Sequence, residues 1–308
     1  MKFLVVGAGA LGGYFGARLL DAGQDVTFLV RAGRAAQLQQ HGLQIKSPKG
    51  DLTLTAPPHL LSEQIQQHYD VVIVGCKAYD LDATMESFAA AIGPDTVILP
   101  VLNGLNHIDR LKTRFGVGKV LGGLCLISAT LDPQGVVLHL NDMHSLAFGE
   151  LDGTVSPRVT AIEKAMSAAN FDARVSDQMT LDMWEKWIFI TSLASASCLL
   201  RGTVGDIVAS GNEALPATLL AECSAIAASN GHAPRAASRE RSLAMLTTAG
   251  SPISASMMKD LERGGAIEAD HIVGDMLARA GDNAAPTLKL AYAHLKTYEA
   301  RRAREAAK

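Results

Sequence analysis

The sequence predicts an α/β domain with a parallel sheet, followed by an all-α domain. In the first half of the chain, short apolar runs alternate with helical stretches, which is the pattern of βαβ units. From about Thr180 onward the β-branched runs disappear, helical periodicity dominates, and glycines fall between helices instead of after strands. We therefore expect one domain over residues 1–177 and a second, all-helical domain over residues 178–308.

Each expected element follows from an apolar run or from a helical period. The predicted strands lie at residues 3–6, 25–30, 71–74, 96–101, 121–130, 136–140, 145–148 and 171–175. Turns are indicated by Asp132-Pro133-Gln134-Gly135 and by Asn141-Asp142, which separate β-rich runs. Helical patterns in the first half lie at residues 11–20, 81–90 and 105–113. Those of the second half lie at residues 181–200, 215–230, 235–246, 254–263, 268–280 and 286–302.

A glycine-rich turn joins the first strand to the first helix. The apolar strand at residues 3–6 runs directly into a GxGxxG pattern that opens a helix. In this pattern the first glycine permits a tight turn, the second lets the backbone approach a pyrophosphate, and the third lets helix and strand pack closely. Unpaired N–H groups at the start of the helix then face the anion. The sequence thus predicts a Rossmann-type dinucleotide-binding domain whose phosphate-binding residues are Gly7, Ala8, Gly9, Ala10, Leu11 and Gly12.

The second strand indicates which dinucleotide is bound. It ends at Arg31, where many such domains carry an Asp or Glu that grips the ribose 2′-hydroxyl. A carboxylate here would repel a 2′-phosphate, whereas a guanidinium can pair with it through two hydrogen bonds. Arg34 lies three residues later. The sequence therefore favours NADP(H) over NAD(H), and the alternative is that Arg31 is a solvated loop residue.

Composition and charge exclude several other classes of function. The net charge of −3 indicates no nucleic-acid-binding surface. The four cysteines form no CxxC pair, so we expect reduced core thiols, and the nine histidines form no HExxH motif that would predict a metal site. The longest apolar stretch, residues 187–200, is too short to cross a bilayer. With no signal peptide visible, we expect a cytoplasmic protein that binds neither membrane, nucleic acid nor metal.

Two side chains follow predicted strands at the edge of the sheet where ligands bind. In open parallel sheets, ligands meet residues just past the carboxyl ends of the strands. Lys77 follows the strand at residues 71–74, and Asn103 follows the strand at residues 96–101. Lys77 could contact the ribose or nicotinamide of the cofactor, and the Asn103 amide could hold a substrate oxygen. The alternatives are a solvated lysine and a simple Asn-Gly turn.

Lys186 lies between Trp184 and Trp187 at the start of the most apolar helix in the chain. Partial desolvation lowers the pKa of a lysine toward the range that is useful for proton donation, so Lys186 is a candidate general acid. The alternative is a surface ion pair with Asp182, four residues earlier. Glu268 follows two glycines and precedes an apolar helical face, which is also typical of a first-turn acid that the helix dipole favours.

Taken in order, these motifs resemble those of the ketopantoate reductases, or 2-dehydropantoate 2-reductases. The resemblance covers nearly the whole chain. The segments that carry it are Gly7–Gly12, Arg31, Cys76-Lys77-Ala78-Tyr79, Asn103-Gly104, Trp184-Glu185-Lys186, Ser256-Met257-Met258-Lys259-Asp260 and Glu268-Ala269-Asp270. The resemblance implies an oxidoreductase that reduces a 2-oxo acid to its 2-hydroxy acid with NADPH. In this family the product is pantoate, an intermediate of pantothenate and coenzyme A biosynthesis.

The resemblance also implies a role for each candidate residue. Lys186 would donate a proton to the ketone oxygen as the hydride arrives, and Glu268 would bind the nascent hydroxyl and help to position the lysine. This agrees with the chemistry, because hydride addition creates an alkoxide that an ammonium can stabilise and protonate. Asn103 and Ser256 would hold substrate oxygens, with Ser256 near the carboxylate. The cofactor-binding residues would be Gly7, Ala8, Gly9, Ala10, Leu11, Gly12, Arg31, Lys77 and Asn103.

Two positions on the lysine helix depart from the family pattern. Four and eight residues after the lysine the family usually has asparagines that line the substrate pocket, whereas this chain has Ile190 and Ala194. These positions share a helix face with Lys186. Losing two amides removes hydrogen-bond partners for a polar substrate and makes room for apolar bulk. Ketopantoate is therefore the first substrate that we expect, and a more apolar 2-oxo acid is the alternative.

Two further functions remain as alternatives. A 3-hydroxy acid dehydrogenase of the related two-domain type usually has an asparagine four residues after its lysine, and Ile190 argues against it. A non-catalytic NADP-binding regulator needs no proton donor, so the joint retention of Lys186, Asn103, Ser256 and Glu268 argues against this function. The only macromolecular partner that we consider is a second copy of the chain in a homodimer, since the helical domain could present an apolar face to it.

Overall fold

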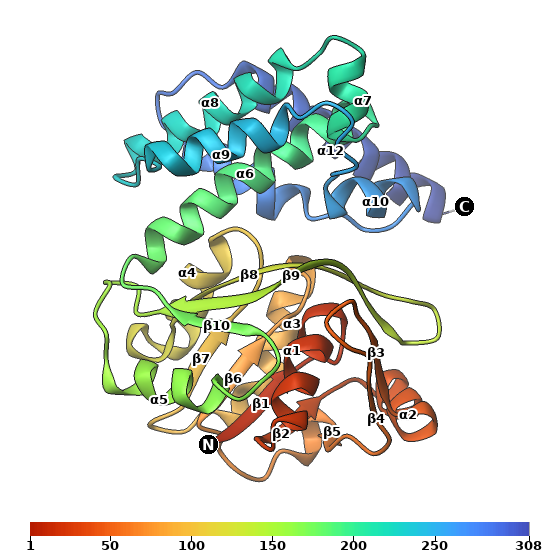
Figure 1. Ribbon diagram of the computed structural model, residues 1–308, viewed down its shortest axis with the longest axis vertical. Helices are drawn as coiled ribbons and strands as arrows, with labels where there is room; N and C mark the ends of the chain where they lie inside the picture. The colour runs from red at the N-terminus through yellow and green to blue at the C-terminus, as the bar shows by residue number, and fades with distance from the viewer. Residues whose placement is uncertain (308) are drawn as a thin grey trace. The chain divides into compact units, whose positions relative to one another are not determined.

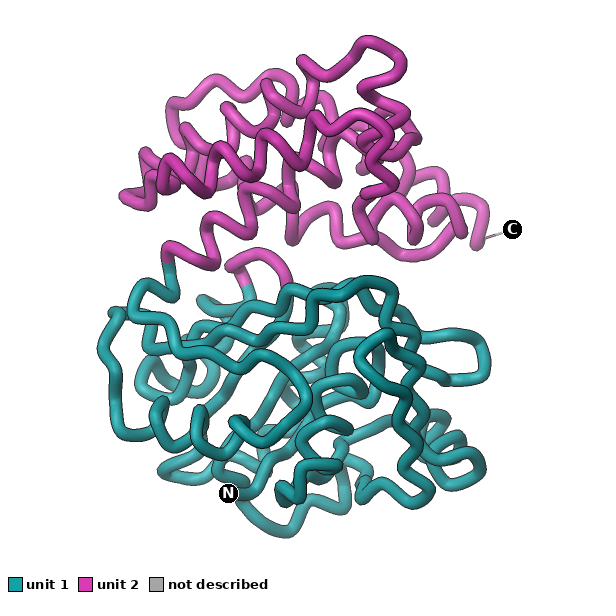
Figure 2. The backbone as a smooth tube through the Cα atoms, viewed as in Figure 1, with its two compact units in different colours: residues 1–102, 107–180 teal, residues 103–106, 181–308 magenta. Residues whose placement is uncertain are grey.

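The computed structural model describes residues 1–307, which divide into two compact units (Figure 2). Unit 1 contains residues 1–102 and 107–180, and unit 2 contains residues 103–106 together with the chain from residue 181 onward. Unit 1 is built on a parallel sheet with helices, and unit 2 is helical. The predicted fold class is thereby confirmed.

Five parallel strands form the central sheet of unit 1, in the order β5-β2-β1-β6-β7 (Figure 1). Their side chains are largely buried, and every residue of β6 and β7 is buried, as expected for a sheet that is covered on both faces. The strand order reverses at β1, and in such sheets the ligand crevice lies at the carboxyl ends of the strands at this point. The bounds are β1 (Lys2–Val6), β2 (Asp25–Leu29), β5 (His59–Leu60), β6 (Val71–Val74) and β7 (Val97–Pro100).

Helix α1 (Ala10–Asp21) lies between this sheet and a second, mixed sheet of unit 1. It can approach the parallel sheet closely because Gly16 has no side chain. A Cβ at this position would lie only 2.6 Å from the ring of Phe28. The core around it includes Phe3, Val5 and Phe15, each at most 1% exposed. The remaining helical segments of unit 1 are α2 (Ala32–His41), η1 (Ser62–Gln64), η2 (Ala78–Asp80), α3 (Leu81–Phe88), η3 (Ala89–Ala91), α4 (Asn106–Phe115), η4 (Val117–Lys119) and α5 (Pro157–Met166).

The second sheet has the order β10-β9-β3-β4, with β8 paired to β9. Its strands are β3 (Leu43–Lys46), β4 (Leu52–Leu54), β8 (Gly122–Leu131), β9 (Val137–Gly149) and β10 (Asp172–Val175). The expected turn at residues 132–135 is confirmed, since the Gly135 N–H donates to the Asp132 carbonyl at 3.0 Å between β8 and β9. The second expected turn, at residues 141–142, was wrong.

Strand β9 passes through Asn141-Asp142 without turning. The Asn141 side chain is used in the ladder, because its Oδ1 accepts the main-chain N–H of Ser128 at 2.9 Å. The pairing register shifts here: Ile127 of β8 faces His144 and Ala129 faces His139, so the extra residues lie in β9. The polar dipeptide therefore lies in a β-bulge of its own strand instead of ending that strand.

Unit 2 is built around the long helix α6 (Met179–Leu200). The other helical segments are α7 (Val204–Ala209), α8 (Ala214–Ser229), α9 (Ala236–Leu246), α10 (Ser256–Glu262), a π-turn over Asp270–Gly274, α11 (Asp275–Ala278) and α12 (Pro286–Ala306). Sequence analysis missed α7, which is too short to show a period. The expected helix at 268–280 is opened by the π-turn. Within residues 1–307, no helix has the length and hydropathy that a membrane span requires.

The apolar helix α6 carries hydroxyl side chains that are fully buried. Two of them bond back to the helix itself, Ser192 Oγ to the Ile188 carbonyl at 2.8 Å and Ser197 Oγ to the Leu193 carbonyl at 2.6 Å. Such bonds let serine occupy an apolar position without an unsatisfied donor. Burial also raises the pKa of Cys198 on the same helix to about 12, so this thiol stays protonated at neutral pH.

Candidate functional site

The glycines of the turn between β1 and α1 are needed for different structural reasons. Gly7 has a φ of +93° and donates its N–H to the Leu29 carbonyl at 2.9 Å, so the turn itself requires a glycine there. A Cβ at Gly12 would lie 2.1 Å from the Gly7 carbonyl oxygen, so close helix–strand packing requires this glycine. A Cβ at Gly9 would meet no atom of residues 1–307 within 4 Å. The fold therefore does not explain Gly9, whereas a ligand that approaches the backbone would.

The segment after β6 lies beside this turn. A Cβ at Gly75 would lie 3.4 Å from the main-chain nitrogen of Gly12. Lys77 follows and is half-buried, and its carbonyl accepts the Asp80 N–H at 3.0 Å to form the short helical turn η2. Lys77 thus occupies the carboxyl edge of the sheet next to the start of α1, where the sequence places a cofactor contact.

Arg31 and Asp80 form an ion pair at the same edge. The guanidinium Nη2 of Arg31, which follows β2, lies 3.3 Å from the carboxylate of Asp80, which follows β6. Since β1 lies between these two strands, the pair spans the end of β1. The Arg31 side chain is 75% exposed and that of Asp80 is 38% exposed. An exposed pair of this kind contributes about 0–1 kcal/mol, so Arg31 can exchange its carboxylate partner for a phosphate at little cost.

Arg34, unlike Arg31, forms hydrogen bonds that support the glycine-rich turn. Its Nε donates to the Ala8 carbonyl at 2.9 Å, and its Nη1 donates to Gln37 at 3.1 Å. The tip of the β8–β9 hairpin also packs on it, since a Cβ at Gly135 would lie 2.2 Å from Nη1. Burial lowers the pKa of the Arg34 guanidinium, and the charge of Asp132 partly offsets this. Arg34 therefore supports the glycine-rich turn, while Arg31 is the more accessible of the two arginines.

In unit 2, the half-buried Lys186 lies in the first half of α6. The two tryptophans beside it in sequence pack on each other with ring centroids 5.0 Å apart. The Arg279 guanidinium lies 5.9 Å and 5.6 Å from their ring centroids. His232 stacks on Trp184 at 5.5 Å. These contacts fix the part of α6 that carries Lys186.

An arginine from the start of α9 binds two acidic residues, Asp182 and Glu185, that precede Lys186 on α6. The Arg235 main-chain N–H and Nε both donate to Glu185 Oε1, at 2.8 Å and 2.9 Å, and Nη2 binds Asp182. Burial acts to raise the pKa of the Glu185 carboxyl, but the hydrogen bonds and charge of Arg235 outweigh it and hold this pKa below its usual value. The Arg235 guanidinium therefore ties both acidic residues of α6 to the start of α9.

The π-turn that follows Glu268 is attached to α6 by two side-chain donors. The Ile272 carbonyl accepts from Trp187 Nε1 at 3.0 Å and from Thr191 Oγ1 at 3.4 Å. The Ile272 N–H donates to the Glu268 carbonyl at 3.0 Å, so Glu268 opens this turn. Short π segments are rare in helices and are frequently found at functional sites.

Two other candidate residues are attached to the same framework. The carbonyl of Asn103 lies 2.7 Å from Nε2 of His271, a residue of the π-turn. The N–H of Ala255 lies 3.4 Å from Ser197 Oγ on α6, and Ser256 is the next residue and begins α10. Within unit 2, hydrogen bonds therefore connect the segments that carry Glu268, Asn103 and Ser256 to α6, the helix that carries Lys186. Sequence analysis missed His271 and Ser197, which carry no motif.

The two positions that depart from the family pattern are both on α6. Ile190 is half-buried, and Ala194 is 3% exposed. Their spacing from Lys186 places them along one side of the helix. Ser197, which bonds the residue before Ser256, continues the same side. The side of α6 that carries Lys186 is therefore apolar over its next two turns.

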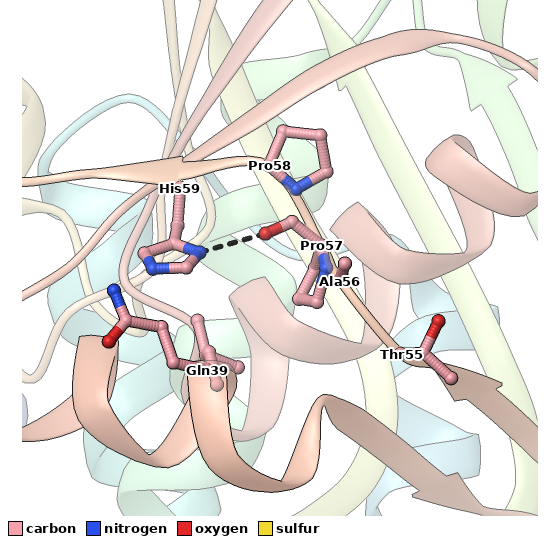
Figure 3. A pocket seen from close by; sticks show the side chains of 7 residues that line it. Gln39, Thr55, Ala56, Pro57, Pro58 and His59 are labelled. Carbon is pink, nitrogen blue, oxygen red and sulfur yellow. Dashed lines mark hydrogen bonds between the residues drawn. The ribbon is translucent and has the colours of Figure 1, made fainter.

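One hollow lies away from these residues. It has a volume of about 370 Å³, and His59 Nδ1 bonds the Pro57 carbonyl at its wall, at 2.8 Å (Figure 3). The hollow separates α2 from the connection between β4 and β5 and is lined by Leu38, Gln39, Thr55, Ala56, Pro57, Pro58 and His59. These seven residues include no Asp, Glu, Lys or Arg, and none of them is a predicted site residue.

Comparison with known proteins identifies the family. The family described as "Ketopantoate reductase PanE/ApbA" matches residues 3–153, and "Ketopantoate reductase PanE/ApbA C terminal" matches residues 178–299. The uncharacterized oxidoreductase YkpB of Bacillus subtilis is 38% identical over 303 residues, which is 97% of this chain and 99% of the relative.

Solved structures agree with this match. The crystal structure of 2-dehydropantoate 2-reductase from Geobacter metallireducens has a TM-score of 0.88 and 27% identity, covering 96% of this chain and 99% of that chain. D-mandelate dehydrogenase, solved with NADH and anilino(oxo)acetate, has a similar fold, with a TM-score of 0.86, 21% identity and coverage of 98% and 99%. The chain belongs to the ketopantoate reductase family of 2-oxo acid reductases.

Proposed function

We propose that this protein reduces a 2-oxo acid to the corresponding 2-hydroxy acid with NADPH, and that 2-dehydropantoate is the first candidate substrate. The observation that carries the proposal is the hydrogen-bonded framework of unit 2. Through Ile272 and His271 it joins the helix of Lys186 to the segments of Glu268 and Asn103. These are the residues that a ketone reduction needs as acid, as acid-positioning carboxylate and as oxygen-binding amide.

Unit 1 has the features of a dinucleotide site. Gly9 leaves open space where a Cβ would otherwise stand, and α1 begins in the same turn with its N–H groups. The accessible Arg31 fits a 2′-phosphate through paired, charge-assisted hydrogen bonds. When bound, the dihydronicotinamide supplies a hydride to the carbonyl carbon of the substrate.

The chain's own residues then manage the developing negative charge. As the carbonyl carbon accepts the hydride, the carbonyl oxygen becomes an alkoxide, and the Lys186 ammonium donates a proton to it. Glu268 accepts a hydrogen bond from the new hydroxyl, and the Asn103 amide and the Ser256 hydroxyl hold the oxygens of the substrate. A preorganised donor costs no reorganisation during the reaction, which is why the fixed position of α6 matters.

The test is the loss of NADPH absorbance with a panel of 2-oxo acids that includes 2-dehydropantoate. Turnover of 2-dehydropantoate alone supports the family's usual reaction. Preference for another 2-oxo acid keeps the mechanism and changes the substrate. No turnover with any member of the panel, while NADPH still binds, contradicts the proposal and favours a non-catalytic NADP-binding regulator.

A more apolar 2-oxo acid is the second candidate substrate, and Ile190 and Ala194 favour it. Neither side chain can hydrogen-bond a polar substrate. A protein of similar fold, D-mandelate dehydrogenase, was solved with anilino(oxo)acetate, whose anilino group is aromatic. The panel should therefore contain 2-oxo acids with branched and with aromatic side chains.

Replacing Ile190 with asparagine is expected to shift kcat/KM toward 2-dehydropantoate, relative to bulkier apolar 2-oxo acids, by about tenfold. One well-placed polar group in a binding site can change preference by this amount or more. Ile190 is half-buried and tolerates the change better than Ala194, where an asparagine would add volume to a filled site. The control is Leu200→Asn, at the exposed end of the same helix. An unchanged preference would mean that Ile190 does not meet the substrate.

Replacing Gly9 with alanine is expected to weaken NADPH binding about tenfold or more without loss of stability, because its Cβ would enter space that only a ligand needs. Gly12→Ala is the matched control. Its Cβ would clash with the Gly7 carbonyl and lower the free energy of unfolding by about 1–3 kcal/mol. Nucleotide titration and urea unfolding measure the two effects. Normal NADPH affinity in Gly9→Ala would remove the turn from the cofactor site.

A further inference from the structure

His271 is a nearly buried histidine in the π-turn, 8% exposed, that no sequence motif singles out. Its Nε2 lies 2.7 Å from the carbonyl oxygen of Asn103. A carbonyl oxygen only accepts hydrogen bonds, so Nε2 carries a hydrogen and donates it. This hydrogen bond joins two segments of unit 2 that are 168 residues apart in the sequence.

The loop on the other side of this bond is shaped to receive the imidazole. Gly104 has a φ of +79°, which a turn alone would explain. In addition, a Cβ at Gly104 would lie 3.1 Å from His271 Cδ2 and 3.2 Å from Nε2. A side chain at this position would push the ring away from the Asn103 carbonyl. The Asn103-Gly104 pair is thus both a turn and the binding surface for His271.

The histidine itself is held by its neighbour in the π-turn. The adjacent Ile272 carbonyl is fixed by Trp187 Nε1 and Thr191 Oγ1 of α6, and Trp187 is the residue after Lys186. The Ile272 N–H binds the carbonyl of Glu268. A continuous set of hydrogen bonds therefore runs from the helix of Lys186, through the turn of Glu268, to the main chain of Asn103.

We propose that His271 is a positioning residue: it holds the main chain of Asn103 so that the Asn103 amide meets its ligand oxygen in register with Lys186 and Glu268. His271 does not touch the substrate. Small displacements of a positioning group cost large factors in rate, because the reacting groups must be held in a near-attack geometry. The catalytic part of this inference rests on the proposed function, whereas the hydrogen bond itself does not.

The first measurement therefore uses the unchanged protein. Long-range proton–nitrogen NMR spectra of the histidine side chains should show His271 with its hydrogen on Nε2 and with slow solvent exchange. A ring that lacks this hydrogen, or that exchanges it as fast as an exposed histidine, would overturn the inference. This result does not depend on whether the protein reduces any 2-oxo acid.

The second measurement compares His271→Leu with His271→Gln. Leucine keeps apolar volume but lacks the donor, so we expect amide hydrogen exchange over residues 101–106 to rise, and kcat/KM for the preferred 2-oxo acid to fall, by about tenfold each. Glutamine has an N–H that can reach the carbonyl and should restore both quantities to within about threefold of the unchanged protein. His232→Leu is the control, since it removes a ring that stacks on Trp184 and should leave residues 101–106 unaffected.

Three outcomes separate the possibilities. Loop exchange and kcat/KM within twofold of the unchanged protein in His271→Leu would overturn the positioning role. Equal impairment of the leucine and glutamine variants would also overturn it, because His271 would then only fill space. If the unchanged protein reduces no 2-oxo acid, the proposed function fails, and the NMR and exchange results still decide whether His271 holds Asn103.

Discussion

Replacing Lys186 with alanine is expected to lower kcat by about two to four orders of magnitude, the usual effect of losing a general acid. The affinity for NADPH should stay within about twofold, because Lys186 is on α6 and the predicted cofactor contacts are in unit 1 or at Asn103. The variant should also fold, since Lys186 is only half-buried. The anchors of α6 around it, Glu185 with Arg235 and Trp187 with Ile272, remain in place.

Single-turnover and steady-state rates with saturating NADPH measure this effect. Lys289→Ala is a suitable control, because Lys289 is an exposed lysine on α12 in the same unit. A loss of less than tenfold in Lys186→Ala would remove Lys186 from the mechanism. A loss of nucleotide binding in the same variant would instead indicate that the helix had moved.

The sequence was sufficient to predict residues whose structural role depends on their near neighbours in the chain. Gly7 and Gly12 can be predicted because the positive φ and the close approach of helix to strand both arise within the first twelve residues. The helix of Lys186 can be predicted because its apolar stretch is long. The turn at residues 132–135 follows from the preferences of its own four residues.

The sequence was insufficient to predict residues whose contacts lie far away in the chain. Nothing near His271 indicates that its ring binds a carbonyl 168 residues away. The Asn141-Asp142 dipeptide suggests a turn on its own, but it lies in a bulge of β9, where the Asn141 side chain binds the main chain of Ser128 in the partner strand. The same holds for the two arginines after β2, which look alike in the sequence. Contacts with Ala8 and Asp80, outside their own segment, distinguish them.

This distinction gives a selective prediction for the cofactor. Arg31→Ala is expected to weaken NADPH binding by about 10- to 100-fold, the range for losing charge-assisted hydrogen bonds to a phosphate. NADH has no 2′-phosphate, and its affinity should change by less than about twofold. Stability should change little, because Arg31 is 75% exposed and its pairing with Asp80 is solvated.

Arg34→Leu is the matched comparison, and it should weaken NADPH and NADH alike, because Arg34 supports the turn through the Ala8 carbonyl instead of meeting a phosphate. Asp80→Asn should tighten NADPH binding a few-fold and leave NADH unchanged, since the carboxylate both occupies Arg31 and repels the 2′-phosphate. Titrations of both nucleotides at one fixed ionic strength measure all three variants. Equal weakening of NADPH and NADH by Arg31→Ala would contradict the 2′-phosphate assignment. Nucleotide binding would then depend on the glycine-rich turn alone, which binds the pyrophosphate that both nucleotides share and so would not discriminate between them.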